Sequence, residues 1–306
     1  MSDLFLVFTN SLVALILCIV IGYICRRRQM INDTHTSGIA ALLLNVAMPA
    51  SVFMSLMRPF SSELLMESLA TFFITGVVYA LGAVLGFLTA KLFKVEQGVR
   101  KCWTFGVAFG NVGFMGLPVI GAVFGPEGLF YVAMALAAFN LHSFTWGVWI
   151  FDKSGVLGPL QVIIKNPALG ATIVGFVFFL TGIRLPAALE GGVSLIAGMT
   201  SPISMILIGA ILAKQPLKDT IMDLKTLPPV AVKLLVLPLL TLLIFRWFIP
   251  NPLMLGVIVT LMAMPTAAAI AIFTEQFNGD SVTAAKLVVV GTLICVITVP
   301  LISLLL

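Results

Sequence analysis

Ten runs of apolar residues follow one another along the chain, separated by short polar, glycine or proline clusters. A helix that crosses the hydrocarbon core of a bilayer needs roughly 20 such residues. The runs lie near residues 4–25, 36–57, 64–92, 101–123, 127–151, 161–181, 187–213, 227–249, 253–275 and 283–305. We therefore predict an all-α polytopic membrane protein with ten transmembrane helices.

The composition supports a membrane protein and excludes several other classes. Hydrophobic residues make up 60% of the 306 residues and charged residues 9%, whereas soluble domains are about 25% charged. The alternating pattern of an outer-membrane barrel is absent. The net charge of +5 is typical of basic cytoplasmic loops, so no nucleic-acid partner is expected. The cysteines lack metal-ligand spacing, and no P-loop, zinc motif or catalytic triad is present, so neither a cofactor nor an enzyme is predicted.

Basic residues are unevenly distributed between alternate loops. With the N-terminus outside, the outer side holds only Arg58, Arg184 and Arg246 of the chain's 17 lysines and arginines. The positive-inside rule therefore places both termini outside, in a bacterial-type inner (plasma) membrane. Lys233, near the start of the eighth run, can extend its ammonium to the membrane surface.

Prolines inside the runs suggest an internal repeat. Pro49 in the second run matches Pro202 in the seventh, and Pro118 in the fourth matches Pro265 in the ninth. Five helices per half is an odd number, so the halves must have opposite orientations. Inverted repeats with interrupted helices at matching positions are typical of secondary transporters. We predict two repeats, residues 1–151 and 161–306.

The fourth run has the most informative composition. Four glycines, Asn111 and Pro118 lie between Gly106 and Pro118, and this composition disfavours a continuous helix. An interrupted helix must be buried in protein or line a wet cavity, and its free N-terminus attracts anions. Pro265 and Thr266 provide the counterpart in the ninth run. The alternatives are close helix packing by the glycines and a simple kink at Pro265.

Neutral polar residues and one histidine complete the candidate substrate site. No Asp or Glu lies in the middle of a run, so a carboxylate-based relay or cation site lacks its usual parts. His142 could exchange protons near neutrality or act as a neutral hydrogen-bonding group. The polar residues could equally bond neighbouring helices. The predicted substrate-binding residues are Asn45, Asn111, Gly113, Pro118, Asn140, His142, Ser201, Pro265 and Thr266.

Four of these motifs resemble the auxin efflux carrier family, which includes plant PIN carriers and bacterial malate or malonate permeases. They are Leu44–Ala50, Gly110–Pro118, Lys233–Pro238 and Pro265. The resemblance covers essentially the whole chain. It implies two inverted five-helix repeats with crossed, broken helices 4 and 9. It also implies a scaffold of helices 1, 2, 6 and 7, a transport part of helices 3–5 and 8–10, homodimers and an elevator-type movement.

The predicted function is secondary transport of a small organic carboxylate anion across the lipid bilayer, as efflux. Inside-negative potential drives anions outward by about 2.3 kcal/mol per charge per 100 mV, without a coupling ion. One alternative is a proton- or sodium-coupled importer of organic acids such as malate or malonate. Another is a membrane sensor that binds its ligand without transport.

Overall fold

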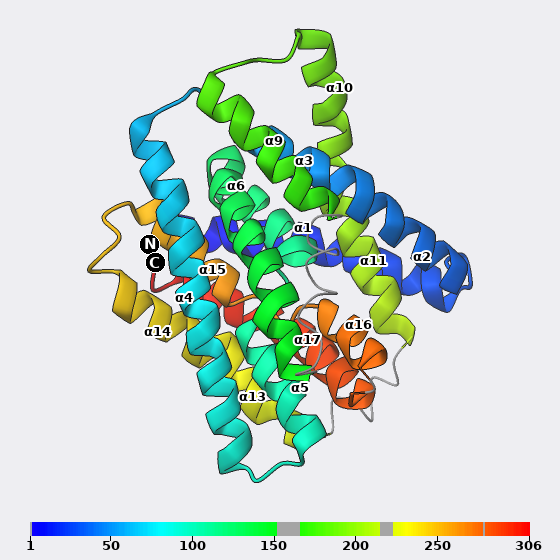
Figure 1. Ribbon diagram of the computed structural model, residues 1–306. Coiled ribbons are helices and arrows are strands. Elements are labelled where there is room, and N and C mark those ends of the chain that lie inside the picture. The colour runs from blue at the N-terminus through cyan, green and yellow to red at the C-terminus, as the bar shows by residue number, and fades with distance from the viewer. Residues whose placement is uncertain (1, 152–165, 215–222, 278) are drawn as a thin grey trace.

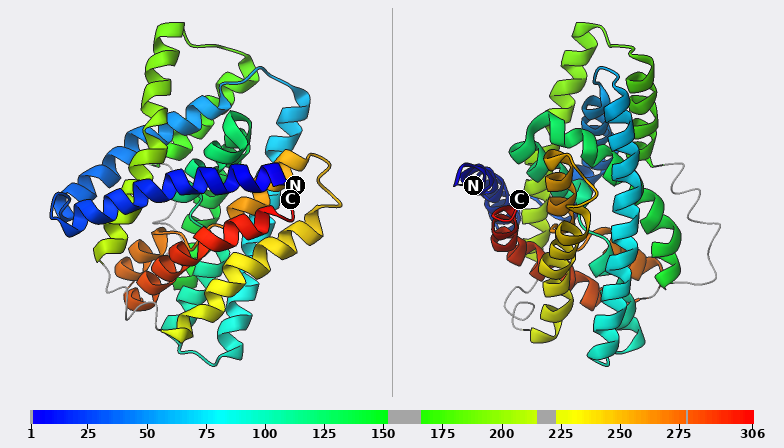
Figure 2. Two further views of the ribbon diagram at one scale, coloured as in Figure 1. Left: turned by 180° about the vertical axis from the view of Figure 1, so that it is seen from behind. Right: turned by 90° about the vertical axis from the view of Figure 1, so that its left-hand side faces the viewer.

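The computed structural model describes residues 2–151, 166–214, 223–277 and 279–306. Regular structure in these residues is entirely helical, apart from one isolated antiparallel bridge between Gly110 and Thr266. The two chain ends lie close together in every view (Figures 1 and 2).

The elements of the first half follow the first five apolar runs. In chain order they are α1 (Ser2–Arg27), α2 (Asp33–Leu42), the π-helical η1 (Leu43–Ala47), α3 (Met48–Leu56), α4 (Ser62–Leu92), α5 (Gln97–Ala108), the π-helical η2 (Val112–Gly116), α6 (Leu117–His142), the π-helical η3 (Ser143–Gly147) and α7 (Val148–Phe151). Within α6 the chain turns at Gly125, whose φ of 66° suits a residue without a Cβ.

The second half continues the pattern. Its elements are α9 (Pro167–Thr181), α10 (Ala187–Gly198), α11 (Thr200–Lys214), the 3₁₀ turn η4 (Leu224–Thr226), α13 (Leu227–Ala231), the π-helical η5 (Val232–Val236), α14 (Leu237–Phe245), α15 (Pro252–Met262), α16 (Ala269–Gln276) and α17 (Ser281–Ser303). Helices thus occur in all ten predicted runs, although residues 161–165 of the sixth lie outside the described residues.

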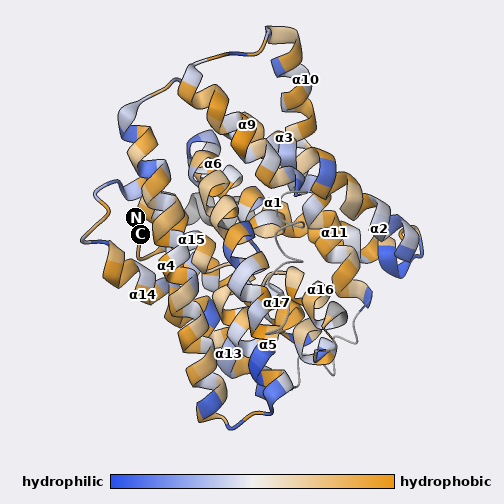
Figure 3. Cartoon of the chain, in the orientation of Figure 1, coloured by the Kyte–Doolittle hydropathy of each residue, from blue (hydrophilic) through white to orange (hydrophobic). Residues whose placement is uncertain are grey.

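Six described helical stretches are long and apolar enough to cross a membrane, judged by length and composition. They are Asp33–Leu56, Ser62–Leu92, Val112–Phe151, Ala187–Lys214, Leu224–Phe245 and Ser281–Ser303. Two shorter apolar helices are Pro167–Thr181 and Pro252–Met262. Hydrophobic residues cover most of the helices, and hydrophilic ones gather at the α1–α2 and α4–α5 turns (Figure 3).

The tightest helix contact joins α1 to α11. A Cβ added to Gly22 would overlap the carbonyl oxygen of Ile206, and one added to Gly209 would overlap that of Ile19. The two backbones touch because small residues allow helices to approach closely. Helices from the two halves of the chain therefore form one closely packed pair.

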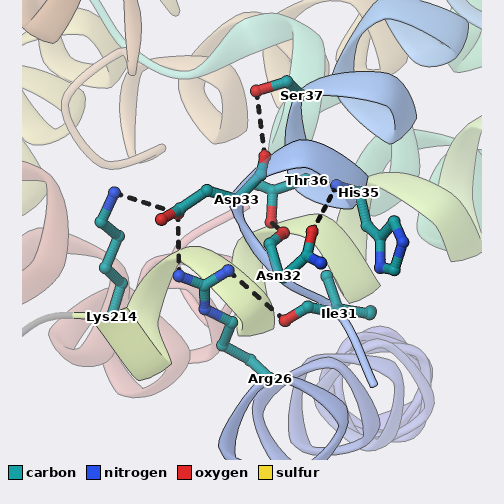
Figure 4. Close-up of polar contacts among 8 residues, drawn as sticks. All are labelled: Arg26, Ile31, Asn32, Asp33, His35, Thr36, Ser37 and Lys214. Carbon is teal, nitrogen blue, oxygen red and sulfur yellow. Dashed lines mark hydrogen bonds and ion pairs between the residues drawn. The ribbon is translucent and has the colours of Figure 1, made fainter. Parts of the chain in front are cut away.

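Ionic contacts join the same elements at one end (Figure 4). Asp33, at the start of α2, accepts from Arg26 of α1 at 2.8 Å and from Lys214 of α11 at 3.1 Å. Asn32 caps α2, since its Oδ1 accepts from the backbone N–H of His35 at 2.9 Å. The ends of α1 and α11 and the start of α2 are thus held together.

Candidate functional site: a crossover of two interrupted helices

Two helices are interrupted near the centre of the molecule. The first stops at Ala108 and resumes as η2 at Val112, while the second stops at Met262 and resumes as α16 at Ala269. Among the helices that adjoin the two interruptions, α15 packs on α6 and α16 packs on α5.

The two interruptions pair with each other. The N–H of Asn111 donates to the carbonyl oxygen of Pro265 at 2.7 Å, and the N–H of Ala267 donates to that of Phe109 at 2.9 Å. The hydroxyl of Thr266 donates to the Gly106 carbonyl at 3.0 Å. Backbone groups freed from the helices thereby find partners, as an apolar environment requires. We call residues 109–111 and 263–268, with the four adjoining helix ends, the crossover.

Aromatic rings hold the first segment of the crossover, residues 109–111, in place. The ring of Phe109 packs against Phe105 at 4.7 Å, Trp146 at 4.8 Å, Tyr79 at 5.2 Å and Phe139 at 5.9 Å between centroids. Such contacts each stabilise packing by about 0.5–1.5 kcal/mol beyond area burial. Helices α4, α5 and α6 and the turn η3 therefore fix the position of the interruption.

The glycines of the fourth run both adjoin the interruption and allow close packing. A Cβ on Gly110 would lie 3.1 Å from Lys233 Nζ, and one on Gly116 would lie 2.7 Å from Leu261 Cδ2. At these positions the interrupted helix and close packing by glycines, which the sequence left as alternatives, therefore occur together.

Asn111 caps the helix that resumes after the first interruption. Its Oδ1 accepts from the N–H of Phe114 at 3.1 Å, and its side-chain nitrogen has no hydrogen-bond partner among the described residues. The start of α16 has no side-chain cap at Ala268. Both starts carry the partial positive charge of a helix N-terminus, which favours an anion.

The other predicted site residues lie at different distances from the pairing. Gly113 lies in η2, where a Cβ would meet Met48 Cε at 3.0 Å. Pro118 is buried in the first turn of α6, the continuation of the same helix. Pro265 and Thr266 are buried within the crossover itself. Of the predicted residues, Asn111 and Pro265 are thus hydrogen-bonded to each other, and Thr266 bonds to Gly106 in the same crossover.

Asn140 and His142 lie at the far end of α6. The Oδ1 of buried Asn140 accepts from Asn166, which caps α9. His142 Nδ1 is 2.8 Å from the Ala138 carbonyl oxygen, and its ring lies where a Cβ of Gly76 would be. One polar atom of each side chain thus has a partner within the protein, and among the described contacts neither residue bonds to the crossover.

Asn45 and Ser201 lie on the elements beside the crossover. Asn45 is exposed in η1, and its amide donates to the Ala41 carbonyl at 2.8 Å. Ser201 is half-buried in the first turn of α11. Leu43 and Leu207, from η1 and α11, pack with Phe114 of η2. These two elements therefore reach the crossover through apolar side chains.

Lys233 is buried beside the crossover. Its side chain is 1% exposed, and Nζ faces the crossover instead of the membrane surface. The π-helical turn η5 holds it there, and π turns, which often mark functional sites, are not detectable in an apolar sequence pattern. The one available signal was a lysine inside the matching motif Lys233–Pro238.

A second polar cluster was also missed. Glu67 accepts from the Tyr131 hydroxyl at 2.6 Å and from Asn251 at 2.7 Å, while Asn251 caps α15. These residues join α4, α6 and α15. Nothing in the sequence indicates this contact, because the three residues are far apart in the chain and follow no motif.

An apolar pocket lies beside the crossover. Residues from α1 and α11 form one side, and residues from the crossover and α17 form the other. They are Leu15, Ile16, Ile19, Met115, Val119, Met205, Met264, Cys295, Val296 and Val299. The contact between these two groups of helices is therefore apolar where the pocket lies.

Comparison with known proteins identifies the family. The family model described as membrane transport protein matches residues 7–157 and 160–303. An uncharacterized transporter of Methanothermobacter thermautotrophicus is 26% identical, covering 97% of this chain and 98% of the relative. The transporter YfdV of Escherichia coli is 23% identical, covering 96% of each. A proposed malonate transporter of Rhizobium meliloti is 23% identical, covering 92% of this chain and 90% of the relative. The chain therefore belongs to the membrane transport protein family, the auxin efflux carrier family that its motifs resemble, and is an integral membrane protein.

Proposed function

We propose that this chain is a secondary transporter that moves a small organic carboxylate anion across the inner (plasma) membrane, with the crossover as its substrate site. The observation that carries the proposal is the pairing of residues 109–111 with residues 265–267. Irregular backbone at membrane depth is tolerated where it is buried or lines a cavity, and transporters build their substrate sites from such segments.

The charge distribution of the crossover supports an anionic substrate. The start of η2, the start of α16 and the ammonium of Lys233 all supply positive charge or positive partial charge. The side-chain nitrogen of Asn111, which has no partner among the described residues, adds a hydrogen-bond donor. The relative named as a proposed malonate transporter is consistent with a small carboxylate.

The helix arrangement supports two inverted repeats of five helices, residues 1–151 and 161–306. In this arrangement helices 1, 2, 6 and 7 form the scaffold, while helices 3–5 and 8–10 form the transport part. Close packing of α1 on α11 and of α3 on α9 agrees with such a scaffold. Packing of α4 on α5 and α6, and of α14 on α15, agrees with such a transport part.

An elevator-type movement would carry the crossover past the scaffold. The apolar lining between α1 and α11 on one side and Met115, Met264 and α17 on the other supports sliding, because non-directional apolar contacts exchange without leaving hydrogen bonds unmade. The homodimer rests on the family resemblance. Basic residues at the α1–α2 and α4–α5 turns favour a cytoplasmic location for both turns, with the termini outside.

Electrogenic efflux needs no coupling ion, and residues 109–111 and 263–268 of the crossover contain no Asp or Glu. A proton-coupled importer would instead use His142, whose ring is half-buried against α4. A membrane sensor would bind the anion at the crossover without moving it.

The test is flux in proteoliposomes loaded with radiolabelled malonate, with other small carboxylates as competitors. A potassium gradient with valinomycin sets the membrane potential. Efflux that rises with inside-negative potential and persists without pH or Na⁺ gradients is expected. Flux that requires either gradient indicates the importer, and binding without flux indicates the sensor.

A further inference from the structure

Lys233 is a buried basic residue with no counter-ion among the described residues. Its side chain is 1% exposed, and Nζ has no hydrogen-bond partner among the described residues. The ion pairs in the same residues are Arg26–Asp33, Lys214–Asp33 and Lys286–Asp223. Removing an ammonium from water costs several kcal/mol unless a partner compensates its charge. A lysine that stays charged in this position therefore requires a negative charge nearby.

The end of this side chain reaches the crossover. A Cβ placed on Gly110 would lie 3.1 Å from Nζ and 3.4 Å from Cε of Lys233, and 3.2 Å from the carbonyl oxygen of Leu261. Gly110 is therefore the residue that leaves room for the ammonium. Leu261 belongs to the last turn of α15, and Gly110 follows the end of α5.

Two helix C-termini thus lie beside the ammonium. Each carries a partial negative charge of about half an elementary charge, which compensates part of the cost of burial. Partial charges of the backbone do not replace a full counter-ion, and carbonyl groups at these helix ends already accept other hydrogen bonds. The Leu261 oxygen, for example, accepts from the N–H of Met264 at 3.2 Å.

We infer that Lys233 supplies the fixed positive charge of the substrate site and that the negative charge of the bound anion is its counter-ion. This inference rests on the proposed transport function and names a residue and a charge requirement for it. Lys233 acts through space, from behind the backbone of Gly110, while Asn111 and the helix N-termini contact the anion. Because the Lys233 ammonium is part of the protein, binding of the anion does not require a bound Na⁺ or proton.

A fixed charge has a signature that packing does not share. Coulomb energy is proportional to the charge of the ligand, so loss of the ammonium should cost a dianion twice the binding free energy that it costs a monoanion. The factor by which Kd rises for the dianion is therefore the square of the factor for the monoanion. If Lys233 only stabilised the ends of α5 and α15, its removal would change both affinities by the same factor.

The experiment compares Lys233→Met, which keeps length and removes charge, with the parent protein. The probes are malonate and monomethyl malonate, which share one body and differ by one charge. Equilibrium binding is measured by calorimetry in detergent, and flux in proteoliposomes. We expect Kd to rise about 10-fold for the half-ester and about 100-fold for malonate. The control is Lys225→Met, because Lys225 is an exposed lysine eight residues earlier. This variant should change the Kd of neither probe by more than about 2-fold.

The outcomes separate this inference from the proposed function. Equal losses for the two probes, or unchanged binding and flux in Lys233→Met, overturn the role of Lys233 alone. Binding without flux in the parent overturns the transport function alone. A parent that binds neither probe counts against both the transport function and the role of Lys233.

If Lys233→Met does not fold, the parent protein alone provides the test of the charge requirement. It must bind malonate more tightly than the half-ester when choline replaces Na⁺ and K⁺, and equal affinity or a requirement for either cation overturns the inference.

Discussion

The backbone N–H of Asn111 donates a 2.7 Å hydrogen bond to the carbonyl oxygen of Pro265. Two segments from opposite halves of the chain thereby hold each other where both have left the helical conformation. Pro265 cannot donate from its own nitrogen, so the pairing continues through the N–H of Ala267 to Phe109. The crossover is therefore a small, specific structure whose parts can be tested singly.

Gly110→Ala should disrupt the crossover. The new Cβ would lie 3.1 Å from Lys233 Nζ and 3.2 Å from the Leu261 carbonyl oxygen, and backbone cannot move aside as a side chain does. We expect malonate flux to fall about 10-fold and stability to fall by about 1–3 kcal/mol. Gly170→Ala in α9, where a Cβ meets no atom within 4 Å, is the control. Equal flux in both variants would argue against a functional crossover.

Gly209→Ala should loosen the α1–α11 pair, because its Cβ would overlap the carbonyl oxygen of Ile19. Overpacking of this kind costs about 1–3 kcal/mol. Thermal unfolding in detergent should show a lower Tm for Gly209→Ala and for Gly22→Ala, but not for Gly170→Ala. A Tm unchanged from the parent would mean that the two helices are further apart than described.

The Asp223–Lys286 pair predicts a pH-dependent contribution to stability. The Lys286 ammonium, 2.6 Å from Asp223 Oδ2, lowers the pKa of Asp223 below its ordinary 3.8. Stabilisation by a carboxylate with a depressed pKa is complete above its unfolded value and is lost as pH falls through the folded one. Asp223→Asn keeps an acceptor for the Lys225 N–H and should cost up to about 1 kcal/mol at neutral pH.

The measurement is Tm of Asp223→Asn and the parent at about pH 7 and about pH 3. The difference between them should shrink at the lower pH. Lys286→Met in the Asp223→Asn background should add little, since the pair is already broken. A difference that is equal at both pH values would show that the pair does not contribute.

His142→Gln separates uniport from proton coupling. The imidazole bonds the Ala138 carbonyl and lies where Gly76 leaves room, so a neutral hydrogen-bonding role predicts that potential-driven flux persists within about 2-fold. Uptake driven by an imposed proton gradient in the parent, and lost in His142→Gln, would instead support the importer.

Much of the helical content was predictable, because long apolar runs leave few other structures in a bilayer. The sequence also indicated where the fourth run is interrupted, since Asn111 and Pro118 with four glycines disfavour a continuous helix. It did not indicate the partner of each freed backbone group, because the pairing of Asn111 with Pro265 depends on contacts between distant segments.

Side-chain direction was the weakest part of the sequence interpretation. The sequence allowed Lys233 to extend to the membrane surface, but the π turn η5 directs it to Gly110. Glu67, Tyr131 and Asn251 were not grouped, since the three polar residues are far apart in the chain and follow no motif. Asn45, a predicted site residue, is exposed and bonds to its own helix.

Asn111→Asp provides the most direct test of the crossover as an anion site. Aspartate caps a helix as well as asparagine does, so the hydrogen bond from the Phe114 N–H is kept while a negative charge replaces the free donor. Asn32→Asp is the matched control, because Asn32 caps α2 in the same way at an exposed position.

The measurement is malonate flux in proteoliposomes for the parent, Asn111→Asp and Asn32→Asp, each with its Tm in detergent. We predict parental Tm for both variants, parental flux for Asn32→Asp and a loss of about 100-fold or more for Asn111→Asp. Parental flux in a folded Asn111→Asp variant would contradict the account, because an anion could not pass a site that had gained a negative charge without a penalty.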